Sequence, residues 1–395
     1  SRSCPAWPED ARLPSRPQFP SRGNPLHAPR WMPLLLLAAL ALSGCDLFGA
    51  NDDESRVTTD VVVANSGNFS AQDGSLTLYN PADSSATQND INVAFINSLA
   101  LYENQLYVVD NTQPNNAGRI TVFSPETLDP VGQISNPRPP RSLAFPSAEK
   151  GYVSNLSRFD GFDPLPSTVS VVDLDRNVVV DSVSVGRSPR GIGVAAGKAF
   201  VANAADGTLS VLDATADTVR STLSLNCTRP KSVFVDEEDE LAVVCQGGGE
   251  QPSEVLFLNP RSTEIVNRVT LGAPVGSANA TQSAYYSDSA EELYAVSGGA
   301  FGNGTGEIFR VDTDANALAT TLQVPQNNAL IGISAVGYDA VAQDLYVTRL
   351  PVNDSGGPLY TANGTALVLD RDGAVVTRFE TGNSPGYVAF LRDTQ

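Results

Sequence analysis

The feature that most constrains the fold is a β-rich motif of four residues that recurs seven times. Successive copies start 45, 45, 48, 42, 52 and 52 residues apart. The seven copies are Val62–Asn65, Tyr107–Asp110, Tyr152–Asn155, Phe200–Asn203, Ala242–Cys245, Tyr294–Ser297 and Tyr346–Arg349. A repeat of this length is one supersecondary unit that cannot bury its apolar surface alone, so neighbouring units must stack against one another.

Each repeat has room for four short strands. In the fourth repeat, for example, the motif precedes an alternating strand at Thr208–Asp213 and a further strand at Val219–Leu225, and the next strand begins at Pro230. Four antiparallel strands per 40 to 50 residues are typical of a propeller blade. We therefore predict an all-β, seven-bladed β-propeller over residues 59–395, with four antiparallel strands per blade. The 32 Gly and 27 Pro residues fit the many turns that this fold requires.

The order of the strands predicts how the ring closes. The strand introduced by Pro is expected to be innermost in its blade, with the four-residue motif on the second strand. The repeats begin with a motif strand at Val61 and end with a Pro-introduced strand at Pro385–Leu391. The C-terminal strand should therefore complete the sheet of the N-terminal blade, which leaves only short exposed edges.

Two repeats carry a resemblance to a known family. Tyr152–Asn155 is followed by Ser167–Asp173, and Phe200–Asn203 by Gly207–Asp213, with a Pro-x-Gly strand start at Pro189–Val194. These segments resemble the YVTN family of β-propeller repeats, and the similarity extends over roughly residues 60–391. Repeats five and six depart from the family's Val-x-Asn ending. The resemblance implies a propeller fold and an extracytoplasmic binding or surface protein.

The N-terminal region reads as a leader and an anchor. Residues 1–31 show no periodicity and precede Met32, the only Met, so we expect them to be an over-extended gene call. The alternative is an Arg-containing n-region that ends at Arg30. The apolar run Leu34–Leu42 suits a signal peptide, and Leu42–Cys45 resembles a bacterial lipobox.

This resemblance implies a lipoprotein signal peptide at 32–44, a lipid on Cys45 and an acidic tether at 45–58. The protein would then be membrane-anchored in the bacterial cell envelope, in the periplasm or on the surface. The alternative is an ordinary signal peptide followed by an accidental Cys.

Charge and composition exclude several classes of function. The chain has 44 acidic and 25 basic residues, a net charge of −19, which disfavours nucleic-acid binding. The single histidine, His27, precedes the expected leader, so the mature protein would contain none. That argues against a His-dependent triad or a His-ligated metal. We expect no cofactor and no metal; Asp312–Asn316 lacks the Gly and Glu of a calcium loop and reads as a turn.

Two cysteines within the repeats are candidates for a disulfide. Cys227 lies just before the Pro230 strand, and Cys245 ends the strand that follows it. These strands should form a hairpin, which brings both cysteines to the same end. An oxidising compartment favours the bond, and two buried thiols are the alternative.

Three cations stand at equivalent positions of successive repeats. Arg141, Arg190 and Lys231 each follow the proline that begins an innermost strand, so we expect them at one mouth of the central channel. Converging cations in an acidic protein are candidates for binding an anionic ligand. The alternative is that each cation pairs with an Asp of a nearby loop.

Long loops after the motif strands should open on the same face. They contain Arg158, Arg349 and Tyr360, and loops on a rigid scaffold often hold binding residues. The alternative is a set of solvated loops. The sequence thus favours a monomeric binding module for an unknown protein or a small anionic ligand. A lactonase-like or other propeller hydrolase that uses carboxylates or a divalent metal, and a structural cell-surface component, are the competing hypotheses.

Overall fold

The computed structural model describes residues 57–393, except 111–116, 249, 277–281, 299–305, 326 and 328. All of these described residues belong to one compact unit. Their secondary structure consists of strands and turns, and among them no helix is long and apolar enough to cross a membrane. The expected gene-call segment 1–31, signal peptide 32–44 and Cys45 lie outside the described residues. Thr58, placed at the end of the expected tether, already begins the first strand.

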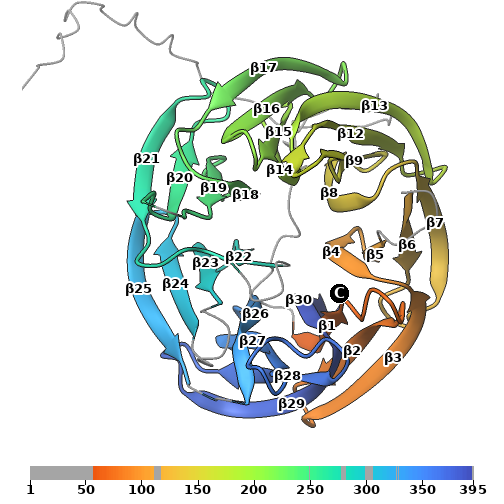
Figure 1. The fold of residues 1–395 in the computed structure, drawn as a ribbon, viewed down its shortest axis with the longest axis vertical. Coiled ribbons are helices and arrows are strands. Elements are labelled where there is room, and N and C mark those ends of the chain that lie inside the picture. Colours follow the sequence, from red (N-terminus) through yellow and green to blue (C-terminus); the bar gives the residue numbers. More distant parts are fainter. Residues whose placement is uncertain are drawn as a thin grey trace, which may run out of the picture. The chain divides into compact units, whose positions relative to one another are not determined.

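Seven four-stranded antiparallel sheets follow one another around a ring (Figure 1). From the innermost strand outward, blade 1 contains β30 (Pro385–Arg392), β1 (Thr58–Asn65), β2 (Gly74–Asn80) and β3 (Ser85–Val93). Blade 2 contains β4 (Ile96–Tyr102), β5 (Gln105–Asp110), β6 (Gly118–Phe123) and β7 (Pro130–Asn136). Blade 3 contains β8 (Pro140–Ser147), β9 (Lys150–Asn155), β12 (Pro166–Asp173) and β13 (Val178–Arg187).

The remaining blades repeat this order. Blade 4 contains β14 (Pro189–Ala195), β15 (Lys198–Asn203), β16 (Thr208–Asp213) and β17 (Thr218–Ser224). Blade 5 contains β18 (Pro230–Val235), β19 (Leu241–Cys245), β20 (Glu254–Leu258) and β21 (Ile265–Thr270). Blade 6 contains β22 (Ala284–Ser287), β23 (Glu292–Ser297), β24 (Gly306–Asp312) and β25 (Ala317–Val324). Blade 7 contains β26 (Leu330–Asp339), β27 (Asp344–Pro351), β28 (Asn363–Leu369) and β29 (Val375–Asn383).

The ring closes as the order of the strands predicts. The C-terminal strand β30 pairs antiparallel with β1, with Val61 opposite Phe390 and Val63 opposite Val388. The first sheet is therefore built from both ends of the propeller. The predicted seven-bladed fold and its closure are confirmed.

The core lies between adjacent blades. One cluster packs Phe200 and Leu209 of blade 4 against Leu241, Val243 and Leu256 of blade 5, and all five side chains are fully buried. Burial of each such side chain contributes about 1.5–3 kcal/mol. The outermost strands are largely exposed, as the pattern of β17 shows. The middle strands are therefore apolar on both faces because each face meets a neighbouring sheet.

The Asn that ends the four-residue motif has a structural role. The Nδ2 group of Asn203 donates hydrogen bonds to the hydroxyls of Thr208 (3.0 Å) and Ser210 (2.9 Å) on the adjacent strand. Asn65 and Asn155 make the same pair of bonds in blades 1 and 3, to Ser75 and Thr77 and to Thr168 and Ser170. In these three blades the motif is followed by Thr-x-Ser or Ser-x-Thr because the Asn amide group donates to both hydroxyls inside the sheet.

Candidate functional site at the channel mouth

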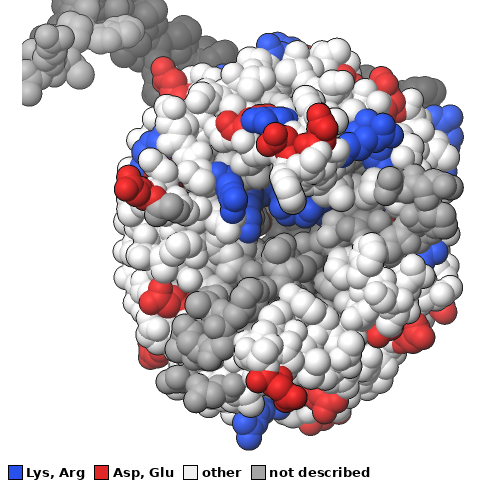
Figure 2. Space-filling model, viewed as in Figure 1, with Lys and Arg blue, Asp and Glu red and all other residues white. Residues whose placement is uncertain are grey.

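The three predicted cations share one position in their blades. In blades 3, 4 and 5 the proline that begins the innermost strand lies opposite the last motif residue: Pro140 opposite Asn155, Pro189 opposite Asn203, and Pro230 opposite Cys245. The residue after each proline is Arg141, Arg190 or Lys231, here called the mouth cations. All three are half-buried. In Figure 2, basic side chains lie around the hollowed centre, on the side where Figure 1 places β8, β14 and β18.

The mouth cations are close enough to repel one another electrostatically. Burial, together with the charges of Arg190, Arg229 and Arg141, lowers the pKa of Lys231 to about 8. Burial and the charge of Arg190 likewise lower the pKa of Arg141. The backbones of β14 and β18 nearly touch here, since a β-carbon added to Gly191 would lie 2.8 Å from the carbonyl oxygen of Lys231.

No ion pair compensates the mouth cations within the described part of the chain. Other cations have carboxylate partners: Arg119 lies 3.0 Å from Asp110, for example, and Lys150 3.0 Å from Asp217. None of the ion pairs found among the described residues includes a mouth cation. The internal gaps in the description contain neither Asp nor Glu in the sequence. The alternative in which each cation pairs with a loop Asp is therefore not observed in this part of the protein.

Neutral hydrogen-bond donors accompany the charges. Burial raises the pKa of the Tyr387 phenol on β30 to about 12, although the charges of Arg141 and Arg190 act in the opposite direction. The hydroxyl therefore keeps its proton at neutral pH and can donate a hydrogen bond. The side-chain nitrogens of Gln246 and Lys231 would lie 3.4 and 3.8 Å from a β-carbon on Gly276. The Nε atom of Arg190 is buried without a hydrogen-bond partner in the structure as described.

Sequence reasoning missed Arg229 and Tyr387. Arg229 is an exposed residue directly before Pro230, and its charge acts on Lys231. Its position beside the Pro-Lys start of an innermost strand was the available signal. Tyr387 occupies β30, where the corresponding segment begins Pro-Gly-Tyr rather than with proline and a cation. No motif distinguished it.

Two expected loop residues lie on accessible parts of this face. Arg158 is exposed beside a short hairpin of β10 (Phe159–Asp160) and β11 (Asp163–Pro164), in which Phe162 is fully solvent-exposed. The backbone of this loop is joined to the start of the blade by a hydrogen bond from Leu156 N to Pro139 O. Tyr360 is 40% exposed in the loop between β27 and β28, and its carbonyl accepts a hydrogen bond from Asn68 (3.5 Å).

Arg349 is not the open loop residue that the sequence led us to expect. It lies within β27, opposite Ile333 and Thr365, and its side chain is fully buried. Its guanidinium donates a 2.8 Å hydrogen bond to the carbonyl of Pro325, and burial lowers its pKa. The motif strand simply continues past the expected boundary, to Pro351, so this position faces the packed interior.

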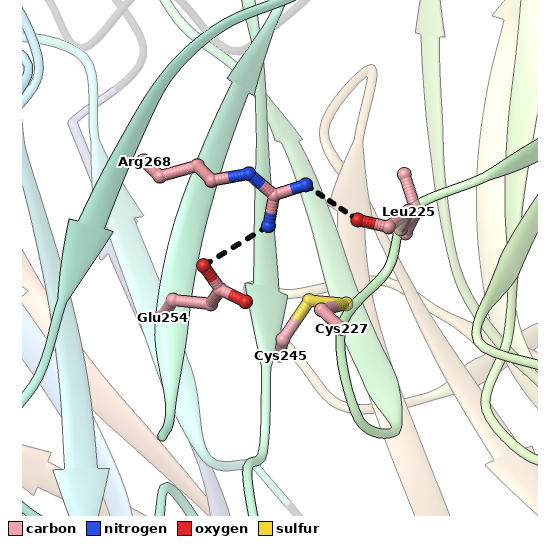
Figure 3. Close-up of a disulfide and its surroundings, with 5 residues drawn as sticks. All are labelled: Leu225, Cys227, Cys245, Glu254 and Arg268. Carbon is pink, nitrogen blue, oxygen red and sulfur yellow. Dashed lines mark hydrogen bonds and ion pairs between the residues drawn. A yellow bond between two sulfur atoms is a disulfide. The ribbon is translucent and has the colours of Figure 1, made fainter. Parts of the chain in front are cut away.

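The predicted disulfide is confirmed. Cys227 and Cys245 are bonded, with their Cα atoms 6.1 Å apart. Close to the bond, Arg268 lies 3.1 Å from Glu254 and donates a 2.6 Å hydrogen bond to the carbonyl of Leu225 (Figure 3). These contacts hold the segment that leads into Pro230 and Lys231.

The opposite face carries an acidic turn between β18 and β19. The carboxylate of Glu237 accepts hydrogen bonds from the hydroxyls of Tyr286 and Thr313 in blade 6. Burial raises the pKa of Glu237 to about 7. Among the residues with described coordinates, no group of three or more His, Cys, Asp or Glu side chains is placed to hold a metal ion. The acidic turn therefore acts as a contact between blades.

Comparison with known proteins identifies the fold. No protein-family model matches the chain, and no curated protein matches it. A quinonprotein alcohol dehydrogenase-like protein from Bacteroides thetaiotaomicron superimposes with a TM-score of 0.61 at 11% identity, over 85% of this chain and 79% of that one.

Two further solved structures are similar. A protein of unknown function from Desulfotomaculum acetoxidans gives a TM-score of 0.60 at 12% identity, over 84% of this chain and 99% of that one. Hydrazine synthase of Kuenenia stuttgartiensis gives 0.54 at 16% identity, over 73% and 92%. At these identities the likeness is one of fold alone.

Proposed function

We propose that this propeller is a lipid-anchored, extracytoplasmic binding module that captures an anionic ligand at the channel mouth. The observation that carries the proposal is the convergence of Arg141, Arg190 and Lys231 without a carboxylate partner among the described residues. It occurs in a chain whose net charge is −19. By contrast, Arg119, Lys150 and Arg268 each lie beside a carboxylate.

Repulsion and desolvation both raise the free energy of the empty site. Charges removed from water are costly unless they are paired, and like charges placed together add to that cost. The lowered pKa values of Arg141 and Lys231 express this cost. An anion bound among the mouth cations would offset both the repulsion between them and the cost of their desolvation. The unfavourable free energy of the empty site therefore favours binding. Complementary charge would also speed the encounter with the ligand.

The surrounding loops supply a second layer of contacts. Arg158, Phe162 and Tyr360 are accessible on the mouth face, and rigid aromatic side chains on loops are effective binding groups. We assign them a peripheral role for larger ligands or for a protein that presents an acidic segment. The mouth cations remain the centre of the site.

A thermal-shift screen tests this function. The purified chain is titrated at constant ionic strength with acetate, succinate, citrate, phosphate and sulfate. At 100 times its dissociation constant, a ligand stabilises the folded state by about 2.7 kcal/mol. We expect at least one anion to raise the Tm of the wild type and to have no effect on the Arg141→Gln/Arg190→Gln/Lys231→Met variant.

The matched control is Arg176→Gln. It removes an exposed cation that is paired with Asp173 at a turn and leaves the mouth intact. This control should respond to anions as the wild type does. Equal responses of the wild type and the triple variant to every anion would refute the proposed site.

The anchor is tested separately. In a bacterial host that processes lipoproteins, the wild type should incorporate labelled palmitate and partition with membranes. Cys45→Ala should lose the label, whereas the double variant Cys227→Ala/Cys245→Ala should keep it. Retention of the label by Cys45→Ala would disprove this part of the proposal.

A further inference from the structure

We infer that the group bound at the channel mouth is a tetrahedral dianion of the phosphoryl type, as in phosphate or a phosphate monoester. This inference rests on the proposed function and specifies its ligand. Three features of the site support it: the directions from which the donors come, their charge, and the lack of carboxylate acceptors beside them in the described structure.

The donors come from several sides of the channel. Arg141, Arg190 and Lys231 lie on β8, β14 and β18, the innermost strands of three consecutive blades. Tyr387 lies on β30 in blade 1, and its phenol interacts electrostatically with both arginines. A phosphoryl group presents three acceptor oxygens in different directions, whereas a carboxylate presents two oxygens in one plane. The spread of donors over four blades fits the tetrahedral group better.

The charge of the site also favours a dianion. Three mouth cations act on one another, with Arg229 as a fourth nearby charge. A monoanion would leave most of this repulsion uncompensated. A phosphoryl group carries about −1.5 to −2 at neutral pH and forms strong, often bidentate hydrogen bonds with guanidinium groups.

The hydrogen-bonding character of the site points the same way. The side-chain nitrogens of Lys231 and Gln246 converge near Gly276, and Arg190 Nε is buried without a partner in the described structure. No ion pair of the described residues brings a carboxylate oxygen to the mouth cations. The dianion of a phosphate monoester has only acceptor oxygens, so it can accept a hydrogen bond from each of these donors without placing one acceptor against another.

Lys231 gives the inference a second readout. Its amine has a pKa of about 8 in the free protein, so about half of the molecules carry the proton at pH 8. A bound dianion favours the charged amine and raises this pKa. Binding at pH 8 should therefore take up about half a proton per ligand, and affinity should fall as the pH rises from 7 to 9.

Isothermal titration calorimetry tests the inference with the full chain. Phosphate, glycerol 3-phosphate, sulfate and acetate are titrated at pH 7 and equal ionic strength. We expect phosphate to bind at least tenfold more tightly than acetate. Comparison of free phosphate with the monoester shows whether the natural source is the free ion or a phosphorylated molecule. Sulfate itself does not titrate between pH 7 and 9. Proton uptake by the protein at pH 8 is therefore measured from the binding enthalpy of sulfate in buffers of different ionisation enthalpy.

Three variants separate the roles of charge and structure. Lys231→Met should weaken phosphate binding about 10- to 100-fold and abolish the proton uptake, since a hydrogen bond to a charged group is lost. Lys231→Arg should restore affinity without the pH dependence between 7 and 9. The control Arg176→Gln should bind as the wild type does.

The outcomes distinguish this inference from the proposed function. If acetate binds within threefold of phosphate and the mouth variants lose both, the site takes anions but the inference of a tetrahedral dianion is wrong. If Lys231→Met takes up as much proton as the wild type, the assigned role of Lys231 is wrong. If no anion binds at all, the proposed function itself fails.

Discussion

Replacement of Asn203 by alanine tests the physical basis of the repeated motif. The Asn203 side chain is fully buried at the end of β15, and its amide donates to Thr208 at 3.0 Å and to Ser210 at 2.9 Å. Alanine removes both hydrogen bonds and leaves a small void beside two hydroxyl groups. The motif should therefore matter for stability rather than for binding.

The expected loss follows from these contacts. Each hydrogen bond contributes about 1 kcal/mol net, and a buried hydroxyl left without its partner adds to the loss, so Asn203→Ala should cost about 2–3 kcal/mol. For a folded unit of roughly 340 residues the entropy of unfolding is about 0.7 kcal/mol per degree. The Tm should consequently fall by about 3–4 °C.

Urea denaturation and differential scanning calorimetry measure both quantities. The control is Asn363→Ala, which removes an exposed Asn whose amide bonds to the exposed Glu380, and it should cost less than about 0.5 kcal/mol. Equal stability of the two variants would refute the role assigned to the motif. A change in anion binding by Asn203→Ala at unchanged stability would also contradict it.

Three further predictions concern the disulfide, the acidic face and the closure of the ring. Breaking the Cys227–Cys245 bond, which joins residues 18 apart, should destabilise the fold by about 3 kcal/mol on the chain-entropy estimate, measured by urea denaturation of the double Ala variant and of the reduced wild type; unchanged stability in both would count against this. Burial raises the pKa of Glu237 from 4.5 to about 7, so the folded state binds more protons between these values and stability should fall as the pH rises from 4.5 to 7. Glu237→Gln should make the urea midpoint less dependent on pH in this range. An unchanged dependence would show that other groups cause it. Deletion of Pro385–Arg392 removes three large buried apolar side chains worth about 5–9 kcal/mol together, so cooperative unfolding should be lost in calorimetry, and a sharp transition near the wild-type Tm would show that β30 is dispensable.

The fold was predictable because it depends on a pattern repeated seven times. Each copy of the motif has the apolar pattern of a middle strand that is buried on both faces. Seven copies therefore support the same strand assignment even where one copy departs from the pattern. The closure by β30 followed from the order of strands alone. The disulfide was predictable for a similar reason, since the hairpin of β18 and β19 brings Cys227 and Cys245 to one end.

The site was only partly predictable. The three mouth cations occupy a repeated register position, so the sequence placed them together. Tyr387 and Arg229 lie at positions without a repeated signal, and their proximity to the cations depends on the closed ring. Arg349 ends a copy of the motif at the position that Asn occupies in blades 1, 3 and 4. It is buried because β27 extends to Pro351, and the sequence-based assignment of this segment to a loop was wrong.

The most direct test of the account is the position of a bound tetrahedral dianion. Crystals of the protein soaked in selenate give an anomalous signal from selenium at each occupied site. The account predicts a peak within hydrogen-bonding distance of Lys231 Nζ and of at least one guanidinium of Arg141 or Arg190, and its loss in Lys231→Met crystals. Selenate peaks confined to exposed arginines such as Arg176, with none at the channel mouth, would contradict it.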